Sequence, residues 1–210
     1  MNYKLTIEYD GSRYDGWQRQ TKTEQTIQGK IENVLSRMEE REIQIFGAGR
    51  TDSGVHARGQ TATGKCYSYR IGTDNCKAVF DRKYRYALGK ELDVEAMKKA
   101  AEDLVGTHDF KSFCGNSRMK KSTVRTVTEI RIEEFPHEVK LTFRGNGFLQ
   151  YMVRILTGTL IEVGLHQRPA DSMGWLLERK ERQLAGATAP AQGLCLEEVY
   201  YHGEQEKIQR

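Results

Sequence analysis

Residues 123–145, TVRTVTEIRIEEFPHEVKLTFRG, carry two long strand patterns on either side of a turn. In the second, Val139, Leu141 and Phe143 alternate with polar residues, which is typical of a strand with one buried face. Pro136 and His137 interrupt the pattern and mark the turn. The sequence therefore predicts two strands, around 123–134 and 138–145, within a sheet.

The N-terminal side adds strands and a helix to this pair. Residues 3–9 and 65–71 alternate as strands do, and Ile43 with Ile45 marks a further strand. Thr26 is a favourable cap for a helix whose apolar residues recur at helical spacing: Ile27, Ile31, Val34, Leu35 and Met38.

The C-terminal side is mostly helical. Asp93 is expected to cap a helix that Gly106 stops, and the apolar stretch 148–165 reads as a helix interrupted by Gly158. Pro169 opens a last helix to about Arg182, and a final strand covers 194–201. The order of elements predicts an α+β protein whose two halves, 1–63 and 64–210, share a mostly antiparallel sheet flanked by helices.

Charge and composition narrow the class of protein. The 210 residues have a net charge of +4, which is too mild an excess to establish nucleic-acid binding. Two basic runs are more suggestive: Arg118, Lys120, Lys121 and Arg125, and the shorter Arg82, Lys83 and Arg85. The four cysteines lie far apart, and no uncharged apolar run is long enough to span a bilayer, so we expect a reduced, cytoplasmic protein.

The loop 47–56, GAGRTDSGVH, has an unusual composition. Its three glycines allow tight turns and close backbone approach, and they flank Arg50, Asp52 and His56. Functional side chains concentrate on loops of this kind. The alternative is a glycine-rich connection in which Asp52 only caps a turn.

This loop resembles the active-site motif of the A-family tRNA pseudouridine synthases, which matches from Gly49 to Ala57. Other blocks of the family follow in order along nearly the whole chain: 9–11, Tyr14, 16–20, 26–32, 65–71, 106–110, 145–149, 152–154 and 193–194. The resemblance implies a pseudouridine synthase fold, with two ferredoxin-like or RRM-like halves. It also implies isomerisation of uridines at positions 38–40 of the tRNA anticodon stem-loop, by a homodimer that needs no cofactor or metal.

The chemistry suits the residues. Hydrolytic glycosidases generally use two carboxylates, whereas an isomerase that admits no water can work with one, either as nucleophile or as base. By resemblance that carboxylate is Asp52, and Arg154 is the cation that keeps it ionised. Tyr67 matches the tyrosine that stacks on the flipped base, while Tyr69, on the same strand face, fits a core position equally well.

The resemblance also implies contacts with RNA. Arg50 resembles the residue that helps to extrude the target nucleotide, and Trp17 and Gln18 are expected near the active site. Exposed cations supply affinity that does not depend on sequence, and this is the role expected of Arg118, Lys120 and Lys121.

The chain departs from the family after Gln60, where several dozen residues of the usual pattern are missing. Fifteen residues separate Asp52 from Tyr67 and can span about 50 Å, so the two can still meet. Loss of a strand, however, would expose strand edges and apolar faces. Two rivals to the tRNA isomerase therefore stay open: an inactive RNA-binding homologue, and a hydrolase that uses Asp52 and His56 as an acid–base pair.

Overall fold

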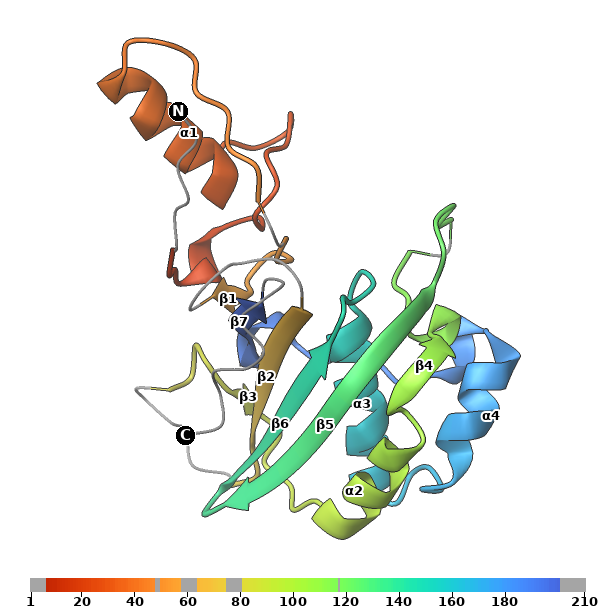
Figure 1. Ribbon diagram of the computed structural model, residues 1–210. Coiled ribbons are helices and arrows are strands. Elements are labelled where there is room, and N and C mark those ends of the chain that lie inside the picture. The colour runs from red at the N-terminus through yellow and green to blue at the C-terminus, as the bar shows by residue number, and fades with distance from the viewer. Residues whose placement is uncertain (1–6, 48–49, 58–63, 75–80, 117, 201–210) are drawn as a thin grey trace, which may run out of the picture.

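The computed structural model describes residues 7–47, 50–57, 64–74, 81–116 and 118–200. In these residues a mixed sheet of seven strands has the order β1-β7-β2-β6-β5-β4, with β3 paired to β2 outside this path (Figure 1). Four α-helices accompany it, and α2, α3 and α4 lie on one face of the sheet. This α+β architecture confirms the predicted fold class.

The centre of the sheet is the predicted hairpin together with the strand that carries the tyrosines. Strands β5 (Val124–Phe135) and β6 (Glu138–Gly145) pair antiparallel. Strand β2 (Gly64–Gly72) pairs antiparallel with β6 and with β7 (Leu194–Tyr200), so Tyr67 stands opposite Phe143 and Leu196. These four strands confirm the corresponding sequence predictions.

Three short strands were not foreseen. Strand β1 (His56–Ala57) pairs parallel with β7, and β3 (Tyr86–Ala87) pairs parallel with β2. Strand β4 (Gly106–Asp109) pairs antiparallel with β5 and begins at the glycine that had been expected only to stop a helix. Each has at most four residues, which is too short for an alternating pattern to be recognised.

The core lies between the sheet and its helices. Helix α3 (Met152–Gly164) is buried along nearly its whole length, and α2 (Val94–Glu102) and α4 (Ser172–Arg179) pack beside it. Tyr69, Leu141 and Phe143 supply the sheet's side of this core and are fully buried. Gly158 does not interrupt α3, which continues through it.

The boundaries of helices α3 and α4 differ from prediction. Helix α3 begins at Met152 and not at residue 148, because Tyr151 takes a left-handed conformation (φ 58°) that is incompatible with an earlier helical turn. Helix α4 begins at Ser172, after a turn in which the Ser172 N–H donates to the carbonyl of Pro169 (3.3 Å). It ends at Arg179, because Lys180 is also left-handed.

The N-terminal segment stands apart from the helical layer (Figure 1). Helix α1 (Ile27–Met38) is capped by Thr26 as predicted. The strand predicted from Ile43 and Ile45 is wrong, because the N–H groups of these residues donate to the side chains of Ser36 and Glu32 instead of to a neighbouring strand. Of the strand predicted over 3–9, residues 3–6 lie outside the described chain, and Tyr9 forms a single bridge with Ala57.

Candidate active site

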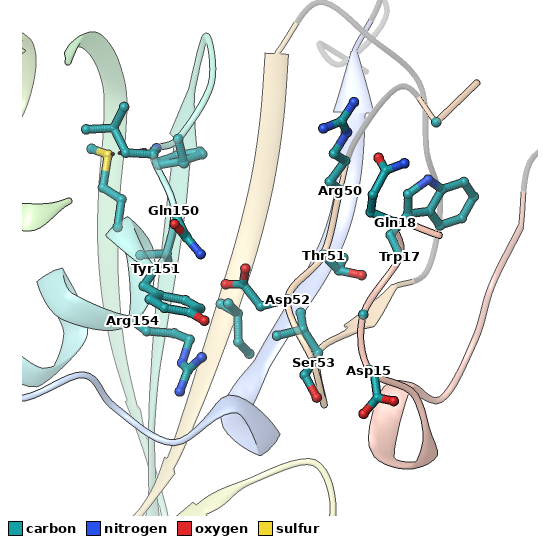
Figure 2. Close-up of a pocket in the computed structure, with 18 of the residues that line it drawn as sticks. Asp15, Trp17, Gln18, Arg50, Thr51, Asp52, Ser53, Gln150, Tyr151 and Arg154 are labelled. Carbon is teal, nitrogen blue, oxygen red and sulfur yellow. Dashed lines mark hydrogen bonds between the residues drawn. The ribbon is translucent and has the colours of Figure 1, made fainter. Parts of the chain in front are cut away.

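A cavity of about 1050 Å³ opens between the loop that follows residue 50, strand β2 and the start of α3. Its lining brings together Asp52, Tyr67 and Arg154, which the sequence had singled out from three distant segments. In Figure 2, Asp52 extends from its loop toward the side chains at the start of α3, Gln150, Tyr151 and Arg154. Arg50, Trp17 and Gln18 line the same cavity from the other side.

Backbone contacts hold the Asp52 loop in place. The carbonyl of Thr51 accepts a hydrogen bond from the N–H of Trp17 (3.0 Å), and the N–H of Gly54 donates to the carbonyl of Tyr14 (3.2 Å). Gly11 packs so closely that a Cβ there would lie 2.0 Å from the carbonyl oxygen of Val55. The glycine in the 9–11 block is therefore required by the close approach of two loops.

The electrostatics of Asp52 combine burial with a nearby cation. Burial raises the pKa of the Asp52 carboxyl above its usual value, and the positive charge of Arg154 opposes that rise. The Nε of Arg154 donates to the carbonyl of Ala189 (2.7 Å), and its guanidinium lies 5.2 Å from the ring centre of Tyr151. Arg154 is thus fixed by its own neighbours and acts on Asp52 through its field.

Tyr67 forms one wall of the cavity and is largely buried, with 7% of its surface exposed. Its ring meets Phe148 edge to face at 5.4 Å. Burial, and next the charge of Asp52, hold the pKa of the Tyr67 hydroxyl well above its usual range. A neutral, rigid aromatic ring therefore stands near the carboxylate. Tyr69 lies on the same strand face, is fully buried and donates to the carbonyl of Pro190 (2.6 Å), so it belongs to the core.

The residues expected to contact RNA differ in position. Trp17 is 3% exposed and its ring lies 6.1 Å from that of Tyr9, so most of its surface packs inside the protein. The amide of Gln18 donates to the side chain of Gln28 (3.0 Å). Arg118, Lys120 and Lys121 do not line the cavity; they are exposed on the loop that precedes β5.

His56 points into a different environment. The N–H of Gly11 donates to its Nδ1 (3.2 Å), and its Nε2 lies 3.1 Å from the carbonyl oxygen of Lys83. It lines a second cavity, of about 740 Å³, together with Asp10 and Tyr84. Asp52 does not line that cavity, so the geometry speaks against the acid–base pair that a hydrolase would need.

Sequence reasoning did not single out several cavity residues, among them Lys65, Gln150 and Tyr151. Lys65 shares a strand face with Tyr67, and the two-residue period could have identified it. The left-handed conformation of Tyr151 has no sequence signal, because a bulky residue rarely adopts it.

The fold is α+β, and its cavity brings a partly buried aspartate, Asp52, together with an arginine and an aromatic ring. The family model described as "tRNA pseudouridine synthase" matches residues 5–93 and 100–202, and the chain belongs to this family. Similar proteins include "tRNA pseudouridine synthase A 1" of Clostridium tetani, 38% identical over 243 residues, and "tRNA pseudouridine synthase A 2" of Bacillus cereus, 39% identical over the same length. Each match covers 95% of this chain and 99% of the relative.

The matched length of 243 residues exceeds the 210 residues of this chain. The relatives therefore contain residues that this chain lacks, as the sequence had indicated. The predicted position of the gap, after Gln60, lies outside the described residues. In the described part of the chain, no helix has the length and apolar character to cross a membrane.

Proposed function

We propose that this protein is a tRNA pseudouridine synthase that converts uridine to pseudouridine in the anticodon arm, with Asp52 as the catalytic residue. One observation carries the proposal: Asp52, Tyr67 and Arg154 line a single cavity. Nothing in the geometry or the comparisons favours an inactive homologue. We further propose that the protein is cytoplasmic and forms a homodimer. Within each subunit, the two halves 1–63 and 64–210 would share one sheet through the pairing of β1 with β7.

The reaction is an isomerisation that balances within one nucleotide. The bond between N1 of the base and C1′ of the sugar breaks, the base turns, and C5 bonds to C1′. C5 loses a proton and N1 gains one. Asp52 serves either as a nucleophile toward C1′ or as a base on the sugar, and both roles require the ionised carboxylate. The charge of Arg154 favours that form against the effect of burial.

The remaining cavity residues suit a flipped base. A uridine cannot react while stacked in the RNA, so it must leave the stack and find another aromatic surface. The ring of Tyr67 is placed to provide that surface. Arg50, two residues from Asp52 on the same loop, is suited to hold the displaced RNA backbone.

Affinity for tRNA is expected to come mostly from phosphate contacts made outside the cavity. The exposed run of Arg118, Lys120 and Lys121 suits this role. Trp17 and Gln18 are proposed to shape the cavity wall that the RNA meets.

Asp52→Asn tests the proposal. It keeps nearly the same shape and removes the charge, the nucleophilic oxygen and the basicity at once. With unmodified tRNA labelled with tritium at C5 of uridine, tritium release should fall below detection, while tRNA binding stays within about threefold, because phosphate contacts dominate affinity. Substantial release by Asp52→Asn would refute the role of Asp52.

Two controls make the outcome specific. Arg154→Met should also abolish release and, in addition, destabilise the fold, because it leaves the partly buried carboxylate of Asp52 without its nearby cation. Parent protein that binds tRNA and never isomerises it would establish the inactive RNA-binding homologue in place of the synthase.

A further inference from the structure

Lys65 lines the cavity but has no role in the proposed reaction. It lies on β2, on the same strand face as Tyr67 and one step of about 6.6 Å along the strand. It lines the same cavity as Asp52 and Arg50. Its partner on the next strand is Gly145, and Gly145 in turn pairs with Val127 on β5, two residues from Arg125.

Three cations lie at this end of the sheet: Lys65 and Arg50 line the same cavity, and Arg125 lies on β5, next to the strand pair that Gly145 forms with Val127. Burial lowers the pKa of Lys65, and the positive charges of Arg125 and Arg50 lower it further. Within the described chain no carboxylate forms an ion pair with Lys65, Arg50 or Arg125. Among the described residues, Arg125 donates to the backbone carbonyls of Ser122 and Val124.

Several other partly buried cations form ion pairs with a carboxylate, whereas Arg154 donates to a backbone carbonyl. Arg70 pairs with Glu138 (2.8 Å), and Arg168 pairs with Glu162 (2.9 Å). Arg85, another buried cation, lies 3.4 Å from Asp74. A partly buried cation without an anion is costly, and two like charges close by increase that cost. Lys65 is partly buried, has no carboxylate partner among the described residues and lies near two further cations, so an anion bound at this cluster would offset its charge.

We propose that Lys65, Arg50 and Arg125 form a subsite for a phosphodiester group of the nucleotide whose base enters the Asp52 cavity. The inference rests on the proposed function for the identity of the ligand. Cationic side chains are the usual partners of RNA phosphates, and this cluster lies one strand step beyond the tyrosine that would stack on the base. Lys65 is then a positioning residue: it anchors the backbone of the flipped nucleotide while Asp52 acts on its sugar.

Binding in the Asp52→Asn background tests the subsite without turnover. Adding Lys65→Met should lower tRNA affinity and flatten the slope of log affinity against log salt by about one unit, because one phosphate contact is lost. Lys65→Arg should retain the slope. The matched control is Lys140→Met, on the opposite face of the sheet, which should leave the slope unchanged.

Thermal unfolding supplies a second readout, independent of RNA and of activity. Without ligand, Lys65→Met should unfold at a higher temperature than its background, because a repelled, partly buried charge is gone. Inorganic phosphate should raise the unfolding temperature of the background more than that of Lys65→Met.

The outcomes separate the two proposals. A salt slope that Lys65→Met leaves unchanged overturns the subsite. If that slope is unchanged and inorganic phosphate nonetheless stabilises the background, the cluster binds a free anion and not the RNA backbone. Parent protein without isomerase activity refutes the proposed function instead, and the salt slopes still decide whether RNA phosphate binds at Lys65.

Discussion

The partly buried carboxylate of Asp52 should lower the stability of the protein. Burial raises its pKa above the usual value, so between the two values the unfolded chain releases its proton before the folded chain does. Below the usual pKa both states are protonated and there is no cost. As pH rises through the raised pKa, stability falls, and the full cost is present above it.

Asp52→Asn is therefore expected to stabilise the protein at neutral pH. The difference in unfolding temperature between the variant and the parent should be near zero at the acid end and should grow as pH rises through the raised pKa of Asp52. Thermal unfolding across this pH range measures it. A variant that unfolds below the parent at neutral pH would mean that Arg154 outweighs burial.

Two substitutions of Tyr67 distinguish a role of its ring in stacking from a role of its hydroxyl group. If its ring holds the base, Tyr67→Ala should cost roughly tenfold more activity than Tyr67→Phe, because stacking is worth about 1–3 kcal/mol per base. Single-turnover isomerisation of tRNA is the measurement. Equal losses for the two variants would assign the role to the hydroxyl, whose high pKa keeps it protonated.

Part of the candidate site could be predicted from the sequence. Asp52, Tyr67 and Arg154 were found because short motifs mark them, and the cavity unites them. Lys65 and Tyr151 were missed for physical reasons: the charge of Lys65 matters only beside Arg125 and Arg50, which lie elsewhere in the chain, and Tyr151 adopts a conformation that a tyrosine does not favour.

Among the elements, α3 depends on one close approach. A Cβ on Gly158 would lie 1.8 Å from the carbonyl oxygen of Ala187. Two residues later the backbone of Ala189 bonds Arg154 twice, through its carbonyl to the side chain and through its N–H to the carbonyl of Arg154. Packing against α3 and the position of Arg154 are thus coupled.

Gly158→Ala should destabilise the protein by about 1–3 kcal/mol or more, as overpacking does, and should lower the turnover rate because Arg154 shifts. Gly174→Ala is the matched control in α4: its nearest neighbour is 4.0 Å away, and it should stabilise by about 0.5–1 kcal/mol. Denaturant unfolding and turnover measure both variants. Full activity for Gly158→Ala would show that the 187–189 segment does not position Arg154.

The basic loop before β5 is the second element with a distinct expectation. Lys120→Gln with Lys121→Gln should flatten the salt slope of tRNA affinity by roughly two units. Lys98→Gln with Lys99→Gln, on exposed positions of α2 at the other end of the molecule, should not change it (Figure 1). An unchanged slope for the first pair would place this loop away from the RNA.

Elements were predictable where a pattern repeats. The hairpin of β5 and β6 has enough residues for alternation to be recognised, and Thr26 and Asp93 cap their helices as expected. The segment at Ile43 and Ile45 has the composition of a strand and is not one, because the described chain provides no neighbouring strand for it. The strand preference of the local sequence therefore gave a wrong prediction here, because a strand forms only where a neighbouring strand can pair with it.

At the scale of the molecule, α1 differs from the other helices. Its apolar residues recur at helical spacing, yet Val34 is 57% and Met38 74% exposed, and the nearby Phe46 is 92% exposed. The sequence could not reveal this, because amphipathic spacing identifies a face and not what covers it. With so little of α1 buried, this helix should be less stable locally than α3.

Assembly can be tested on the whole chain. If the protein is the proposed homodimer, light scattering at micromolar concentration should give close to twice the chain mass of 24.1 kDa. A monomer that still modifies tRNA would show that one subunit contains a sufficient site. Dilution of the dimer, followed by both mass and activity, measures whether the two are linked.

The position of β7 has a consequence for how the protein is made. Strand β7 (Leu194–Tyr200) lies between β1 and β2, so the short strand directly after the Asp52 loop joins the sheet only through residues nearly 140 positions later. Ala187 and Ala189, which contact α3 and Arg154, also belong to this late part of the chain. A ribosome therefore releases the Asp52 loop long before β7 and the segment that holds Arg154 exist, and a growing chain should bind no flipped base until its last strand has emerged.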